Sequence, residues 1–123
     1  GEIRRQGEKV ALLAFGSMLA PCLAAAEELN ATVVNMRFIN PLDEELIASM
    51  AAKHDLLVTV EENTIMGGAG SAVTESLYKQ KIYIKVLQLG LPDTFIDQGD
   101  HAQMLANCGL DKDGIVRSVN SAL

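Results

Sequence analysis

The sequence predicts an α/β domain with the layers of a three-layer α/β/α sandwich. Short apolar runs without alternation, at residues 10–15 and 56–60, are typical of strands covered on both faces. Segments with helical spacing of apolar residues separate the predicted strands, and strands connected through helices form parallel βαβ crossovers. A chain of 123 residues has the size of one domain. We therefore expect a single domain over residues 1–123.

The first half of the chain supplies three predicted strands and two predicted helices. Residues 2–6 form a short strand whose charges suit a sheet edge, and residues 10–15 and 32–36 form the next two strands. Between these two strands the apolar spacing is helical, and Asn30 is the predicted end of the helix. Asp43 is predicted to cap the second helix, because a carboxylate accepts hydrogen bonds from the first free N–H groups. The buried face of this second helix is predicted to comprise Leu46, Ile47, Met50 and Ala51.

The second half contains two more predicted strands, at residues 56–60 and 82–89, with a glycine-rich bend and a helix between them. The helix after the bend has a face of small residues suited to close packing, formed by Ala69, Ala72, Val73, Ser76 and Leu77. A short helix is expected at about residues 100–107. The last helix is expected to begin at Asp111. Its inward residues are predicted to be Ile115, Val116, Val119 and Leu123.

Composition and charge argue against two classes of partner. The formal net charge is −6 with a pI near 4.8, and no cationic cluster is larger than Arg4-Arg5, so we expect no nucleic acid partner. The apolar runs are far shorter than the ~20 residues that a membrane-spanning helix needs, and no signal-peptide pattern begins the sequence. We therefore expect no membrane association and a cytoplasmic location. Because the first residue is Gly1 rather than Met, we expect the chain to be part of a longer protein.

The residue types that usually carry chemistry are scattered. Cys22 and Cys108 have no CxxC partner or His at ligand spacing, so both are expected to be buried or half-buried thiols. His54 and His101 occur in no metal-binding or catalytic motif and are expected at the surface. The aspartates of residues 93–113 lack the spacing of a calcium loop. We therefore predict no catalytic, cofactor-binding or metal-binding residue within this chain.

The strongest candidate site lies where the strand at residues 56–60 passes through the glycine-rich bend into a helix, a junction where open α/β sheets gather their chemistry. Its candidate residues are Glu61, Glu62, Asn63, Gly67, Gly68 and Gly70. The glycines match neither GxxxxGK[ST] nor GxGxxG, so a sharp turn with close packing is the simpler interpretation. Adjacent glutamates in a strand point to opposite faces and form no acid/base pair, which favours salt bridges at an interface. An anion at the helix N-terminus is the open alternative.

Four motifs follow one another along the chain. They are Met36-Arg37-Phe38 with Pro41-Leu42-Asp43, Glu61-Glu62-Asn63 with Met66-Gly67-Gly68-Ala69-Gly70, Gly90-Leu91-Pro92-Asp93 with Phe95-Ile96 and Gln98-Gly99, and Gly109-Leu110-Asp111 with Gly114-Ile115. In order and spacing they resemble the C-terminal domain of the 1-deoxy-D-xylulose-5-phosphate synthases, members of the transketolase-like family that depends on thiamine diphosphate. The resemblance runs from about Gly1 to the C-terminus.

The resemblance implies a mixed, mostly parallel five-stranded sheet whose first strand is antiparallel to the others. It also implies a full-length enzyme with two further domains before this one. That enzyme condenses pyruvate with glyceraldehyde 3-phosphate, with decarboxylation, for isoprenoid, thiamine and pyridoxal biosynthesis. Thiamine diphosphate and Mg²⁺ would bind in the missing domains, so the fragment alone is expected to be inactive. Its expected role is to brace the preceding domain of its own chain and to contribute to a homodimer.

Two other functions stay open beside this one. The residues of the glycine-rich bend could hold a small anion or nucleotide as a regulatory site. The related domain in the beta chains of 2-oxo acid dehydrogenases docks a partner acyltransferase, so a partner-docking domain is the other alternative. The Gly90-Leu91-Pro92-Asp93 motif favours the synthase over the dehydrogenase.

Overall fold

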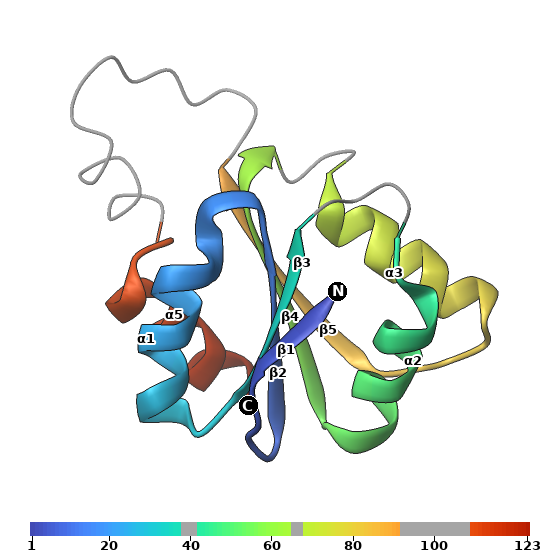
Figure 1. Cartoon of the computed structure of the whole chain (residues 1–123), viewed down its shortest axis with the longest axis horizontal. Coiled ribbons are helices and arrows are strands. Elements are labelled where there is room, and N and C mark those ends of the chain that lie inside the picture. Colours follow the sequence, from blue (N-terminus) through green and yellow to red (C-terminus); the bar gives the residue numbers. More distant parts are fainter. Residues whose placement is uncertain (38–41, 65–67, 92–108) are drawn as a thin grey trace.

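The computed structural model describes residues 1–37, 42–64, 68–91 and 109–123. Its five strands form one mixed sheet in the order β1-β3-β2-β4-β5, with layers of helices on both faces (Figure 1). The strands are β1 (Glu2–Arg5), β2 (Val10–Phe15), β3 (Thr32–Arg37), β4 (Leu56–Thr64) and β5 (Lys85–Leu91). Only the β1–β3 pair is antiparallel, and the other three pairs are parallel. The predicted fold class is confirmed.

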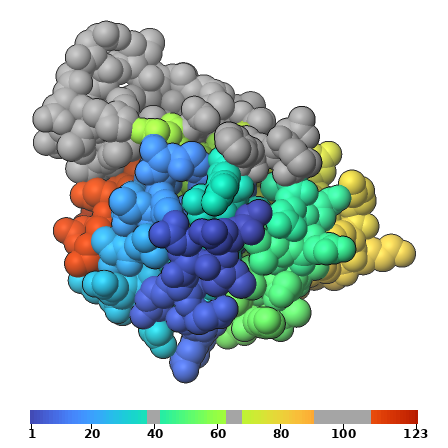
Figure 2. All heavy atoms as spheres, viewed as in Figure 1, coloured from blue at the N-terminus to red at the C-terminus, as the bar shows by residue number. Residues whose placement is uncertain are grey.

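The described helices divide between the two faces of the sheet. They are the short 3-10 helix η1 (Gly16–Met18), α1 (Leu19–Leu29), α2 (Glu44–Lys53), α3 (Ala69–Lys79) and α5 (Lys112–Ala122). Helices α1 and α5 cover one face, and α2 and α3 cover the other (Figure 1). In the space-filling view the N-terminal residues that include β1 lie between the surfaces of α1 and α2 (Figure 2). No helix within the described ranges has both the length and the apolar character needed to cross a bilayer.

The sheet separates two apolar cores. All six residues of β2 are buried, because the strand lies inside the sheet and is covered on both faces. This double coverage explains why its sequence does not alternate. Beneath α1 and α5 the core includes Leu12, Val33, Val58, Leu110 and Ile115. Beneath α2 and α3 it includes Leu13, Val34, Ile47, Leu57 and Val73.

The predicted ends of the helices are confirmed where the structure describes them. Asn30 ends α1 with a left-handed backbone, φ 51°, a conformation that Asn adopts more readily than most residues. The side chain of Asp43 accepts a hydrogen bond from the backbone N–H of Leu46 at 3.2 Å. Asp111 caps α5 in the same way, accepting from Gly114 N–H at 2.9 Å. The helix expected at residues 100–107, together with His101 and Cys108, lies outside the described residues.

Several predicted positions differ from the structure. The strand expected at residues 56–60 continues to Thr64. The strand expected at residues 82–89 begins only at Lys85, because Ile82 N–H instead bonds Leu77 O at the end of α3, and Ile82 and Ile84 pack against the core beneath α2 and α3. Leu123, expected to point inward, is 63% exposed. Helix α5 ends at Ala122, so Leu123 lies beyond the last residue that the helix holds against the core.

His54, predicted at the surface, is instead buried. Its Nδ1 lies 2.7 Å from Met50 O and its Nε2 lies 2.7 Å from Thr32 Oγ1, which also accepts from Gly7 N–H at 2.8 Å. A neutral imidazole with its hydrogen on Nδ1 satisfies all of these groups. A Cβ at Gly7 would lie 2.3 Å from Asn30 O, so only glycine brings this N–H to Thr32. The network ties the turn before β2 to β3 and α2.

Thr32→Val is expected to destabilise the domain by about 1–3 kcal/mol, because it leaves the buried His54 Nε2 and the half-buried Gly7 N–H without this partner. Thr32→Ser, which keeps the hydroxyl oxygen, is the matched control and should retain most of the stability. The free energy of unfolding in urea, compared among the three proteins, measures both effects. An unchanged stability in Thr32→Val would contradict the role of the hydroxyl, and an equal loss in the two variants would show that the methyl group contributes as much as the hydroxyl.

Candidate functional site

The candidate site lies where β2 and β4 end side by side in the sheet. After β2 the chain runs through η1 and α1 to β3, and after β4 it runs through α3 to β5, so the connections leave on opposite faces of the sheet (Figure 1). Ligands of open α/β sheets bind in the crevice outside such a pair of carboxyl ends. The contents of this crevice decide what the domain can do.

Glu61, the first candidate residue, is only 4% exposed at the end of β4. Its Oε2 accepts a hydrogen bond from Gly70 N–H at 2.9 Å, and its carboxylate also accepts from Ala69 N–H. Both donors belong to the first turn of α3, where N–H groups have no partner within the helix. The N-terminus of α3 is therefore occupied by a carboxylate of the same chain.

Gly70 allows α3 to begin close to the sheet. A Cβ at this position would lie 2.7 Å from the side chain of Gln88 on β5, which pairs in register with Thr59 of β4. The small first turn therefore brings its N–H groups down to Glu61. This close approach agrees with the packing role that the sequence predicts for the glycine.

One oxygen of Glu61 has no partner. Its Oε1 is buried without a hydrogen bond, and so is Oγ1 of Thr59, two residues earlier and hence on the same face of β4. Burial raises the pKa of Glu61, and the N–H groups of Gly70 and Ala69 lower it in part. Desolvation disfavours the charged form more than these two donors favour it.

Glu62 makes a different connection, on the opposite side of β4. Ser17 Oγ donates to Glu62 Oε2 at 2.5 Å, and Ser17 belongs to η1, directly after β2. This bond spans the crevice between the two strands. Sequence reasoning missed Ser17 as a partner. The Gly-Ser pair that ends the apolar run of β2 is the signal that could have found it.

The other candidate residues are placed only in part. Gly68 is buried and precedes α3 as its N-cap, and its carbonyl accepts from Ala72 N–H at 3.2 Å. Asn63 lies within β4, with its side chain outside the described atoms, and Gly67 lies outside the described residues. The structure therefore brings Glu61 and Gly70 into contact and directs Glu62 away from them.

The described residues near the crevice offer no reactive group. The described part of the chain holds no cluster of three or more His, Cys, Asp or Glu side chains that could bind a metal ion. Burial raises the pKa of the Cys22 thiol to about 12, which leaves it protonated and a poor nucleophile.

A phosphate at the N-terminus of α3 would displace the Glu61 carboxylate or lie beside it.

Comparison with known proteins identifies the family. The family model described as "Transketolase, C-terminal domain" matches residues 1–115. The chain belongs to the transketolase C-terminal domain family. A solved structure titled "Split gene transketolase, inactive beta4 tetramer" superimposes with a TM-score of 0.89 at 34% identity, over 98% of this chain and 41% of that one.

Two curated relatives of this transketolase C-terminal domain share one name. A protein of Nitrosomonas eutropha named 1-deoxy-D-xylulose-5-phosphate synthase is 69% identical over 123 residues, which are all of this chain and 20% of the relative. A synthase of the same name from Burkholderia cenocepacia is 58% identical, over 97% of this chain and 19% of its own length. The chain thus spans about a fifth of the relatives it matches.

Glu61→Gln is expected to change how stability depends on pH. Because the pKa of Glu61 is raised in the folded protein, its acid form contributes stability that is present below the ordinary value of 4.5 and is lost as pH rises through the folded value. The glutamine amide oxygen still accepts from Gly70 N–H, without this loss. Urea unfolding from about pH 4 to about pH 8 measures the free energy of unfolding of both proteins. This free energy should rise in the variant relative to the native protein as the pH increases. A constant difference across this range would contradict the assignment.

Proposed function

We propose that the chain is the C-terminal structural and assembly domain of a 1-deoxy-D-xylulose-5-phosphate synthase. The supporting observation is 69% identity to a protein of that name over every residue of this chain. The share of 20% of that relative supports the view that residues 1–123 form one domain of a longer multidomain enzyme. Its partners are then the preceding domains of the same polypeptide and, through the assembled enzyme, a second copy in a homodimer.

The full enzyme would condense pyruvate with glyceraldehyde 3-phosphate and release CO₂. Its product would serve isoprenoid, thiamine and pyridoxal biosynthesis, in the cytoplasm. Thiamine diphosphate and Mg²⁺ would be held by the parts of the enzyme outside this chain. The described residues do not fit these groups, because Glu61 already binds the N–H groups of α3 that would receive a diphosphate and the described acidic residues form no metal cluster.

The contents of the crevice support a structural role for the candidate residues. Hydrogen bonds within the chain use Glu61 and Glu62 to join the end of β4 to α3 and to η1. Such bonds fix the positions of the helix N-termini at the edge of the sheet where the strands end. A rigid edge of this kind suits an interface with a neighbouring domain, and we assign the loop of Gly67, Gly68 and Gly70 to that interface.

The long polypeptide that contains this chain is expected to form 1-deoxyxylulose 5-phosphate from pyruvate and glyceraldehyde 3-phosphate when thiamine diphosphate and Mg²⁺ are supplied. The 123-residue chain assayed alone should give no product above background. Product detection by mass spectrometry checks both expectations. Turnover by the isolated chain would contradict the assignment of catalysis to other domains, and an inactive long polypeptide would contradict the proposed reaction.

The alternative function, a regulatory site for an anion or nucleotide at the glycine-rich bend, has a direct test. A ligand present at 100 times its Kd adds about 2.7 kcal/mol to the stability of the folded state. We expect phosphate, pyrophosphate and nucleotides at millimolar concentration to leave the thermal unfolding midpoint unchanged, because Glu61 occupies the N–H groups of α3. A rise in the midpoint that Gly70→Ala abolishes would favour the regulatory site. Co-purification with an acyltransferase would instead favour the partner-docking alternative.

A further inference from the structure

Two buried oxygen atoms lie near the first turn of α3 without a hydrogen-bond partner. Thr59 is 0% exposed and Glu61 is 4% exposed. Within the part of the chain that the structure describes, Oγ1 of Thr59 and Oε1 of Glu61 are the two buried side-chain oxygens that bond to no other group. A buried polar atom without a partner is unfavourable, and such atoms are rare in folded proteins. Two of them on one short stretch of a strand indicate a ligand that both can bind.

The two side chains share one face of β4, because side chains two residues apart on a strand point the same way. Leu57, which shares this face, belongs to the core beneath α2 and α3, and Glu61 binds Gly70 of α3 from it. Residues two apart on a strand are separated by about 6.6 Å along its axis. A water molecule at about 2.8 Å from each of two oxygens joins atoms up to about 5.6 Å apart. Because the Glu61 side chain is long enough to cover the difference, one water molecule can bond to both oxygens.

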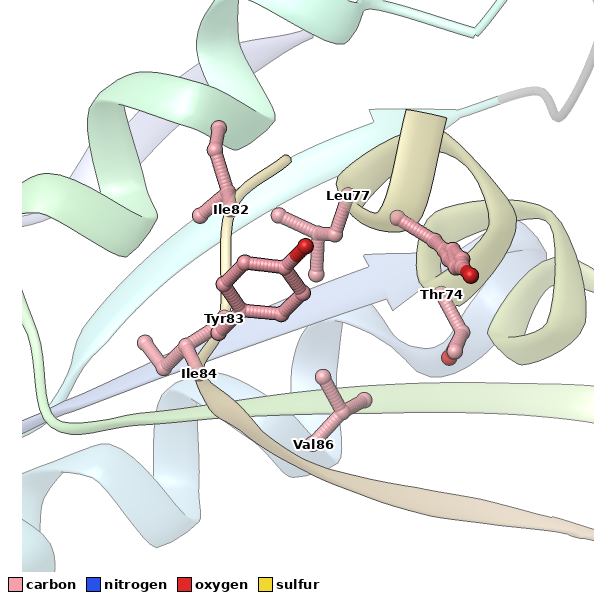
Figure 3. A pocket seen from close by; sticks show the side chains of 7 residues that line it. Thr74, Leu77, Ile82, Tyr83, Ile84 and Val86 are labelled. Atoms are coloured by element: carbon pink, nitrogen blue, oxygen red, sulfur yellow. The ribbon is translucent and has the colours of Figure 1, made fainter. Parts of the chain in front are cut away.

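The polar side chains beside these two residues bind elsewhere. Gln88 of β5 pairs in register with Thr59, and its Nε2 donates to Thr74 Oγ1 at 3.3 Å. Thr74 Oγ1 in turn donates to Gly70 O at 2.9 Å. Figure 3 shows Thr74 at the hollow between α3 and the segment that leads into β5, which it helps to line. These side chains therefore bind each other and the backbone of α3, and they leave the oxygens of Thr59 and Glu61 for another partner.

The chemistry of the two oxygens selects water among small ligands. An ionised carboxylate only accepts hydrogen bonds, whereas a hydroxyl group can donate or accept, and a water molecule can bond to both. The near-complete burial of Thr59 and Glu61 leaves no path for a larger ligand. A metal ion needs more donors than these two, and the described residues contain no group of three or more His, Cys, Asp or Glu side chains that could hold one. Buried waters typically occupy places where polar groups would otherwise be unsatisfied.

We propose that one buried water molecule is bound between Oε1 of Glu61 and Oγ1 of Thr59, beneath the first turn of α3. Both oxygens of the Glu61 carboxylate are then held. Oε2 accepts from the helix, and Oε1 accepts from the water that Thr59 holds. The water thus fixes the orientation of the carboxylate that binds the N-terminus of α3. The inference goes beyond the proposed function and does not depend on which reaction the longer polypeptide catalyses.

High-resolution crystal structures of the full-length protein and of two Thr59 variants test this site. The native protein should show the density of an ordered water within about 3.2 Å of both oxygens. Thr59→Val, which keeps the shape of the side chain but removes the hydroxyl, should lose this density. Thr59→Ser, which keeps the hydroxyl, is the matched control and should retain it.

Three results would overturn the proposal. In the first, Oε1 of Glu61 in the native protein bonds directly to a protein group, with no water density beside it. In the second, the water is equally well ordered in Thr59→Val, which would remove Thr59 from the site. In the third, the density has five or more oxygen neighbours at about 2.0–2.6 Å, which is the coordination of a cation rather than of a water. If Thr59→Val fails to fold, the native and Thr59→Ser structures still decide between a bridging water and a direct bond.

Discussion

The bond between the Glu61 carboxylate and the first turn of α3 determines how this end of the sheet is built. It joins the end of β4 to the beginning of α3, and glycine at position 70 lets the helix lie close to Gln88 of β5. Together with the Ser17–Glu62 bond it connects the end of β4 to helices on both faces of the sheet. A doubly wound sheet usually uses the crevice at this place for a ligand, whereas here two carboxylates beside it bind groups of the same chain.

The described residues thus have the fold of an α/β domain without the reactive groups that such folds often carry. Function resides in particular sites rather than in a fold, and the place where an α/β sheet would carry a site is occupied here by bonds within the chain. A buried carboxylate with one unsatisfied oxygen costs stability, and the N–H groups of Gly70 and Ala69 that bind Glu61 offset part of this cost. Fixing the start of α3 also fixes the direction in which the far end of the helix meets the segment entering β5.

The signals that predicted the fold are local. Asp43, Asp111 and Asn30 act within one turn of their own helices, and the apolar runs reflect burial along a single strand, so each can be read from neighbouring residues. Contacts between distant residues were not predictable in this way. The contacts of His54 with Thr32, and of Thr32 with Gly7, form only when the chain folds. Ser17 and Glu62, which are hydrogen-bonded, lie 45 positions apart in the sequence. The opposite directions of Glu61 and Glu62 were predicted, because the period of a strand requires them.

The placement of the two tyrosines has a spectroscopic consequence. The chain has no Trp, so its tyrosine emission comes from Tyr78 and Tyr83, which both line the hollow between α3 and β5. An event elsewhere in the domain changes this signal only if it reaches the end of α3 or the beginning of β5. The protein thus carries a native optical reporter of that hollow, with no dye or engineered residue required.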